Sequence, residues 1–209
     1  MDLVALTGGD YELLDTGAET RLERFGEFVF DRPSPVALWG REHPERWGKA
    51  DGVYHRSADG GGHWTFARTL PKEWTLSWDG LRFQIKPTGF GHMGLFPEHT
   101  GHWNWVAGRV RSAAHCRVLH LFAYTGALSL VAARAGAEVC HVDAVRDIVG
   151  WARANAAASG LEKAPVRWIV DDATGFVLRE ARRARSYDCL LYTSPSPRDR
   201  TRSRMPSSA

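Results

Sequence analysis

Apolar and polar residues alternate on both sides of the pair Asp79-Gly80 in residues 74–86, WTLSWDGLRFQIK. An alternation with period two indicates β-strands, and an Asp-Gly pair accepts the positive φ angles that a type I′ turn requires. This segment is therefore predicted to form a β-hairpin. Residues 1–70 are rich in Gly, Pro and Trp, and this composition predicts short strands and irregular segments without a definite order.

From residue 117 onward, short apolar runs alternate with stretches of helical periodicity. The predicted strands are 118–122, 137–142, 166–170 and 187–191, and the predicted helices between and after them are 127–135, 147–159 and 176–185. One more helix is predicted before this region, at 98–110. Gly136 and Gly160 follow two of these helices, in the position where glycine commonly ends a helix. Strands that alternate with helices imply a parallel sheet with right-handed crossovers.

The predicted fold class is α/β: a Rossmann-like parallel sheet, present as its first four strands, preceded by a small β-rich region with a hairpin. We divide the chain into residues 1–86, 87–191 and 192–209. The last segment has no apolar period, which is typical of a disordered basic tail. It also interrupts an apolar strand and resembles translated sequencing-adapter read-through, so we expect the native sequence to stop near residue 189.

The charge balance carries no signature of a nucleic-acid-binding surface. The net charge is +3, but residues 189–209 hold four arginines and one aspartate, and without them the balance is neutral. No apolar run is long enough for a transmembrane helix, and the N-terminus lacks the pattern of a secretory signal. The three cysteines do not form a disulfide framework. We therefore expect a cytoplasmic protein without a membrane partner.

Ligands of open parallel sheets bind at the carboxyl ends of the strands, where three features of this chain converge. The first is the turn 122–126, FAYTG, whose small residues allow close approach to a ligand; a purely structural turn is the alternative. The second is Asp143, which can accept both hydroxyls of a ribose or cap the next helix. The third is the pair Asp171-Asp172, of which one can accept from an adenine amine and one can cap a helix.

Together these features resemble the class I methyltransferases that use S-adenosylmethionine (SAM), and in particular the branch of the bacterial 23S rRNA cytosine-C5 methyltransferases. The resemblance extends over residues 83–188. It is carried by the stretches GHMGLFPEH, LHLFAYTGALSLVAARAGAEVCHVDA, WARANAAASGL and VRWIVDDATGFV.

The resemblance implies SAM as the cofactor and RNA as a partner and methyl acceptor. It implies that the turn lines the methionine and ribose side, that Asp143 binds the ribose, that Asp172 lies near the adenine, and that the segment before residue 99 closes the pocket. The residues so implied are Phe96, Pro97, Glu98, Phe122, Ala123, Tyr124, Thr125, Gly126, Asp143, Ala144, Asp171, Asp172 and Ala173.

The chain departs from this family at its catalytic parts. The family's Asp-Pro-Pro-aromatic motif does not follow the fourth strand, and cytosine-C5 methylation needs a cysteine nucleophile. Cys116, Cys140 and Cys189 do not stand where that nucleophile is expected. We therefore assign no catalytic residue and expect this chain, as written, to lack methyl transfer. Histidine and cysteine spacings also predict no metal site.

Two other functions are weighed against a methyltransferase. An NAD(P)-dependent oxidoreductase has a related fold, but the turn lacks the G-x-G-x-x-G pattern of dinucleotide sites. A noncatalytic fragment that only binds a nucleotide is the other alternative. The sequence does not indicate an oligomeric state.

Overall fold

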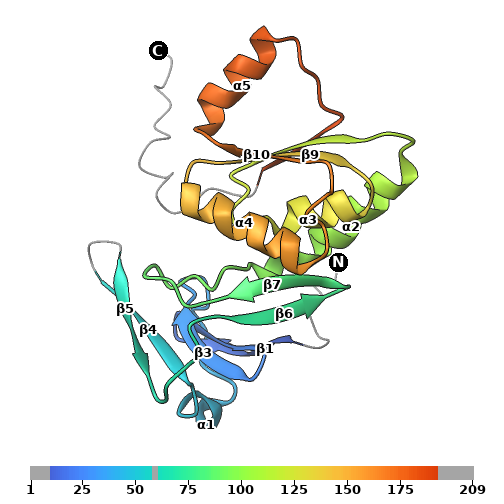
Figure 1. Ribbon diagram of the computed structural model, residues 1–209. Helices are drawn as coiled ribbons and strands as arrows, with labels where there is room; N and C mark the ends of the chain where they lie inside the picture. The colour runs from blue at the N-terminus through green and yellow to red at the C-terminus, as the bar shows by residue number, and fades with distance from the viewer. Residues whose placement is uncertain (1–9, 58–60, 193–209) are drawn as a thin grey trace.

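The computed structural model describes residues 10–57 and 61–192, which form two β-structured parts with helices between them (Figure 1). Residues 193–209 lie outside this description, and with them nearly all of the segment expected to be a non-native tail. Tyr192, which we assigned to that segment, is instead the last residue of a strand that pairs within the second sheet.

The first part is a five-stranded sheet with the order β1-β2-β3-β4-β5. Neighbouring strands are antiparallel except β3 and β4, which are parallel, and a short helix, α1, lies in the connection between them. Buried and half-buried residues alternate along β3, as expected of a strand with one face on a core. The elements are β1 (Tyr11–Gly17), β2 (Thr20–Phe25), β3 (Phe28–Pro33), α1 (Pro44–Trp47), β4 (Gly52–Arg56) and β5 (Gly62–Phe66).

The hairpin follows this sheet as β6 (Trp74–Trp78) and β7 (Leu81–Ile85), which confirms its prediction. Asp79 and Gly80 have φ angles of 42° and 73°, the positive values that a type I′ turn needs at both central positions. The hairpin lies between the first sheet and the helices of the second part (Figure 1).

The second part is built on a four-stranded parallel sheet with the order β10-β9-β8-β11. The strands are β8 (Arg117–Leu121), β9 (Glu138–Asp143), β10 (Val166–Val170) and β11 (Cys189–Tyr192). Each predicted strand is present within a few residues of its expected place. The prediction of a Rossmann-like parallel sheet is thus confirmed.

Helices cover both faces of this sheet (Figure 1). The 3₁₀ helix η1 (Pro97–His99) leads into α2 (Thr100–Ser112), which lies with α3 (Ala127–Arg134) and α4 (Arg146–Ala158) between the sheet and the hairpin. The opposite face is covered by α5 (Ala173–Arg182). The helix predicted at 176–185 was therefore misplaced. It starts earlier because Asp172 caps it, and it ends earlier because Ala184 takes a left-handed φ of 51°.

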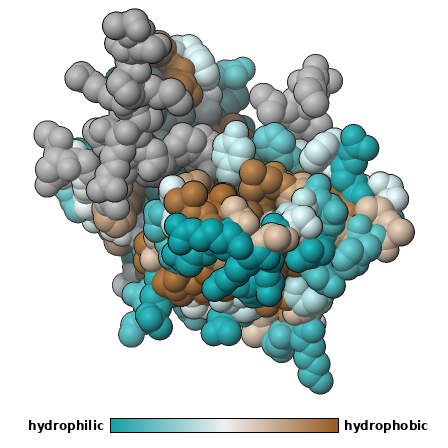
Figure 2. Space-filling view, turned by 90° about the horizontal axis from the view of Figure 1, so that it is seen from above, coloured by the Kyte–Doolittle hydropathy of each residue, from teal (hydrophilic) through white to brown (hydrophobic). Residues whose placement is uncertain are grey.

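Two of the three apolar clusters of the described residues follow from this layering. Residues of the first sheet, the hairpin, α2, α3 and one face of the parallel sheet form the larger cluster. The other face of the parallel sheet packs on α5 in the smaller one. Figure 2 looks down on the molecule from above and shows apolar side chains gathered at the surface; Leu178 of α5 and Leu190 of β11 are 54% and 57% exposed. Within the described residues, no helix has the length and apolar character of a membrane span.

Candidate cofactor site

The turn between β8 and α3 has a strained backbone. Phe122 and Tyr124 have φ angles of 52° and 50°, and Gly126 has 86°. Left-handed conformations are costly for residues with a side chain, by roughly 1–2 kcal/mol each, and persist where the surroundings enforce them. Here the Ala123 N–H donates to Val142 O at 3.0 Å, and the Gly126 N–H donates to Ala123 O at 3.0 Å. No side chain caps the N-terminus of α3, which begins directly after this turn.

Asp143 ends β9 beside this turn and accepts two backbone hydrogen bonds. Its Oδ2 accepts from the Tyr124 N–H at 2.9 Å, and its Oδ1 accepts from the Val145 N–H at 3.0 Å. The N-cap of α4 is Val145, whose own side chain makes no capping hydrogen bond. The Asp143 carboxylate binds the Val145 N–H from two residues earlier, so it contacts the start of this helix as well as the turn. A carboxylate offers about four lone-pair sites, so Asp143 can accept further hydrogen bonds besides these two.

Asp171 and Asp172 follow β10, the next strand along the same edge. The Asp171 N–H donates to Asp143 O at 3.0 Å, so the carboxyl ends of β9 and β10 lie side by side. Asp172 is the helix cap that the sequence left open, since its Oδ1 accepts from the Gly175 N–H at 2.9 Å. Asp171 instead pairs with Arg179. The neighbouring Ala173 is buried at the start of α5.

The segment before α2 flanks the turn from the other side. The ring of Phe96 lies 5.0 Å from that of Tyr124, and the Thr125 hydroxyl donates to Gly94 O at 2.5 Å. Pro97 is buried at the start of η1. Glu98, which the resemblance placed at the pocket, pairs with Arg21 of the first sheet at 3.4 Å.

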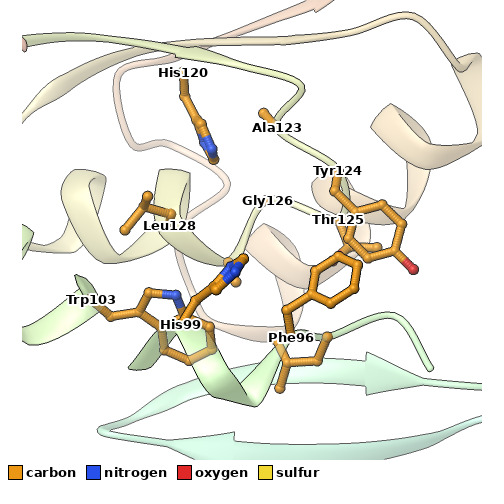
Figure 3. Close-up of a pocket in the computed structure, with 11 residues that line it drawn as sticks. Phe96, His99, Trp103, His120, Ala123, Tyr124, Thr125, Gly126 and Leu128 are labelled. Atoms are coloured by element: carbon orange, nitrogen blue, oxygen red, sulfur yellow. The ribbon is translucent and has the colours of Figure 1, made fainter. Parts of the chain in front are cut away.

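A small cavity of about 20 Å³ lies between this segment and the turn (Figure 3). Turn residues 123–126 line it together with Phe96, His99 and Trp103 from the helical side and His120 from β8. Burial raises the pKa of Tyr124 to about 12, so its phenol stays protonated beside the turn. The Tyr124 turn thus contacts Asp143 at the end of β9 and also the segment that precedes α2.

The architecture matches solved methyltransferases. The structure of the SAM-dependent methyltransferase from Agrobacterium tumefaciens is similar with a TM-score of 0.85 and 44% sequence identity, over 90% of this chain and 61% of that chain. The fold is that of the class I methyltransferases. SMU.776, described as a methyltransferase and complexed with S-adenosylhomocysteine (SAH), shares the fold at a TM-score of 0.73 and 20% identity, over 90% of this chain and 52% of that chain.

Sequence comparison points to the same group. The ribosomal RNA large subunit methyltransferase K/L of Shewanella baltica is 30% identical over 118 residues, which are 56% of this chain and 16% of the relative. The chain thus spans less than two thirds of these relatives. No family model matches the sequence.

Within this methyltransferase fold, one polar cluster went unnoticed in the sequence analysis. Nδ1 of His120 lies 2.7 Å from the Ser129 hydroxyl, which lies 3.0 Å from Nδ1 of His141. All three side chains are buried, and burial lowers the pKa of each histidine to about 3. Both imidazoles are therefore neutral at physiological pH. The available signal was that these histidines interrupt apolar strands at paired positions of β8 and β9.

The three cysteines are poorly suited to act as nucleophiles. Cys116 and Cys140 are buried in the core, and Cys189 is half-buried in β11. Burial raises the pKa of all three thiols, which disfavours the reactive thiolate. In the part of the chain that the structure describes, no group of three or more His, Cys, Asp or Glu side chains could hold a metal ion.

Proposed function

We propose that this chain binds SAM at the carboxyl ends of β8, β9 and β10, as part of an enzyme that methylates RNA. The observation that carries the proposal is the contact between Asp143 and the strained turn. The Asp143 carboxylate accepts from the Tyr124 N–H at 2.9 Å, at the carboxyl end of β9 where ligands of open parallel sheets bind. Backbone strain of this kind is typical of ligand sites.

The residues present fit a nucleoside with an amino-acid tail. Asp143 keeps acceptor capacity for ribose hydroxyls, and the uncapped N-terminus of α3 attracts a carboxylate. Phe96 forms an aromatic wall next to Tyr124. One carboxylate oxygen of Asp172 accepts the capping hydrogen bond of α5, and the other oxygen can accept from an adenine amine. Bound SAM would supply an electrophilic methyl group, and the protein's own part is to hold it in position.

RNA is the acceptor that the comparisons favour. The curated relative that matches this chain acts on ribosomal RNA by its name. The neutral charge balance of residues 1–188 does not itself indicate RNA, so the acceptor class is proposed from the name of this relative alone. We assign no catalytic residue, because the three cysteines are poorly suited to nucleophilic attack.

Calorimetry with SAH tests the cofactor. We expect the wild-type chain to bind, and Asp143→Ala to weaken binding by about tenfold or more, as for a lost charge-assisted hydrogen bond. Asp147→Ala is the matched control, because Asp147 is an exposed acid in the first turn of α4. An SAH analogue without the ribose hydroxyls should bind wild type and Asp143→Ala equally. Unchanged SAH affinity in Asp143→Ala would remove the ribose role.

The acceptor and the rival cofactor need separate measurements. A hybrid that continues this chain with the C-terminal part of the Agrobacterium protein is incubated with labelled SAM, large-subunit ribosomal RNA and protein substrates. Label in the RNA supports the proposal, and label in protein alone contradicts it. Thermal stabilisation by NAD or NADP but not by SAH would favour the oxidoreductase alternative.

A further inference from the structure

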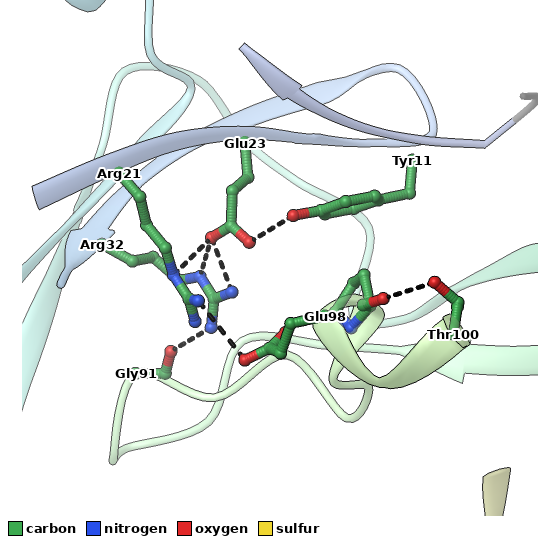
Figure 4. Close-up of polar contacts among 8 residues, drawn as sticks. Tyr11, Arg21, Glu23, Arg32, Gly91, Glu98 and Thr100 are labelled. Atoms are coloured by element: carbon green, nitrogen blue, oxygen red, sulfur yellow. Dashed lines mark hydrogen bonds and ion pairs between the residues drawn. The ribbon is translucent and has the colours of Figure 1, made fainter. Parts of the chain in front are cut away.

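A buried ion-pair network lies in the first sheet, on the side that faces the methyltransferase part (Figure 4). Glu23 of β2 has no exposed surface, and its carboxylate accepts from Tyr11 at 2.8 Å and from Arg32 Nε at 2.8 Å. Arg32 Nη2 lies 2.6 Å from the same carboxylate, and Arg21 Nε lies 3.1 Å from it. Burial and the Glu23 charge both raise the pKa of the Tyr11 phenol. One carboxylate thus collects two guanidinium groups and a phenol.

Both arginines also reach out of the sheet. Arg32 Nη1 donates to Gly91 O at 3.0 Å, and Arg21 Nη1 contacts Glu98 Oε1 at 3.4 Å. Gly91 and Glu98 stand near the two ends of the segment 91–98, which we call the connecting loop. The network therefore contacts this loop at two points, the buried Arg32–Gly91 hydrogen bond and the half-exposed Arg21–Glu98 ion pair.

The connecting loop in turn touches the proposed cofactor site. Gly94 O accepts the Thr125 hydroxyl, and the rings of His92 and Phe96 lie 6.3 Å and 5.0 Å from Tyr124. Gly94 also seats against Trp151 of α4, since a Cβ there would come within 2.2 Å of that ring. A continuous path of contacts runs from Glu23 through the loop to the strained turn.

Stability alone is a poor reason for such a network. A buried ion pair often contributes no more than apolar side chains of equal volume, because both charges lose their hydration. A guanidinium group instead fixes geometry, because its planar set of N–H donors determines the positions of several acceptors at once. Arg32 uses these donors to set the Gly91 carbonyl relative to Glu23.

We propose that Glu23, Arg32 and the Arg21–Glu98 pair are positioning residues for the cofactor site. They set the connecting loop against the Tyr124 turn, so the first sheet controls ligand affinity without touching the ligand. This inference rests on the proposed function for its ligand, SAH. It also gives Glu98 a role distinct from direct contact with the cofactor.

The half-exposed Arg21–Glu98 contact can be tested in folded protein, because its removal leaves the buried Arg32–Glu23 pair intact. Arg21→Gln should weaken SAH binding about two- to fivefold, the range of a partly exposed ion pair. Glu98→Gln should also weaken SAH binding. Because Arg21→Gln removes both the Glu98 and the Glu23 contacts of Arg21, the double variant should bind no more weakly than Arg21→Gln alone. Glu12→Gln is the matched control: it removes the similarly exposed Arg24–Glu12 pair of β1 and β2, which does not reach the loop. Its affinity should equal that of wild type.

The buried contact of Arg32 with Glu23 and Gly91 is tested by Arg32→Lys, which keeps the charge but loses the planar guanidinium. We expect SAH to bind about tenfold more weakly. Amide hydrogen exchange without ligand should rise at residues 91–98 and 124–128 in Arg21→Gln and Arg32→Lys, and stay unchanged in Glu12→Gln. Unchanged exchange there, or a lower melting temperature with wild-type SAH affinity, overturns the inference. If wild type fails to bind SAH, the proposed function fails, and the exchange data still decide whether the network holds the loop.

Discussion

The two sheets of this molecule bury polar side chains in different ways. The first sheet buries charge: Glu23 and Arg32 are 0% and 2% exposed and lie in direct contact. On the face that packs against α3, the parallel sheet buries neutral groups: His120 and His141 share the Ser129 hydroxyl and stay unprotonated. A buried ion pair fixes the direction of its contacts, but both charges lose their hydration. A buried pair of neutral histidines carries no such penalty, and it destabilises the fold only at low pH, where the unfolded histidines bind protons.

The difference follows from what each cluster has to do. The charged cluster connects separate pieces of the chain, β1, β2, β3 and the connecting loop, and needs strong directed contacts. The neutral cluster lies within one βαβ unit, whose geometry the sheet and α3 already fix. Removal of a hydrogen-bonding partner should therefore lower the stability of the protein most in the first sheet. Low pH should destabilise chiefly the parallel sheet.

The largest expected effect is that of Arg32→Met. It leaves the Glu23 carboxylate buried without its main partner, and we expect a loss of about 3–5 kcal/mol in the free energy of unfolding. Urea denaturation at pH 7 measures this loss. Glu12→Gln, at the exposed pair with Arg24, should cost at most about 1 kcal/mol. Equal losses for the two variants would contradict the comparison.

Gly94→Ala should have the next largest effect, a loss of about 2–4 kcal/mol in the free energy of unfolding. Gly94 has a φ of 91°, and an added Cβ would lie 2.2 Å from Trp151, so strain and overpacking act together. Gly89→Ala is the control in the same stretch of chain, since nothing lies within 4 Å of its added Cβ. Thermal unfolding of both variants measures the difference, and the idea that the connecting loop is tightly seated fails if they unfold alike.

Acid should weaken the parallel sheet through its histidines. Burial lowers the pKa of His120 and His141 to about 3 in the folded state, whereas unfolded histidine titrates near 6.5. The unfolded state therefore binds more protons between these values, and stability falls as pH drops below about 6.5. Each histidine contributes up to about 1.4 kcal/mol per pH unit in this window.

Unfolding free energies at pH 7 and pH 5 measure this slope. His120→Gln should reduce the slope, while His115→Gln should leave it unchanged because the His115 side chain is 62% exposed. A slope that is the same in His120→Gln and wild type would show that the acid sensitivity arises elsewhere.

The smallest expected effect concerns Asp172. Asp172→Ala removes the cap of α5 and should cost about 1 kcal/mol. Asp172→Ser should restore most of that stability, because serine also caps helices, but it lacks a carboxylate. Thermal unfolding and SAH calorimetry of the two variants separate the cap from the proposed adenine contact. If serine restores SAH affinity as well, the carboxylate has no part in binding.

Local patterns were enough for the elements that position the candidate site. The Asp79-Gly80 hairpin and the four parallel strands could be predicted because turn chemistry and apolar period act between near neighbours in sequence. The place of Asp143 beside the turn followed as well, since parallel strands bring their carboxyl ends to one edge. Helix ends were less certain, as α5 shows, because a cap depends on which of two adjacent acids faces the helix.

The sequence by itself thus determined the Rossmann-like half of this chain and the edge where a ligand would bind. Only the tertiary structure decided the strand order of the first sheet, the pairing of Arg32 with Glu23 and Gly91, and the sharing of Ser129 by His120 and His141. The physical reason is that these contacts join side chains of different strands, helices and loops, at separations of 9 to 59 positions along the chain. Such contacts leave no period in the sequence, and their geometry exists only once the sheets have packed.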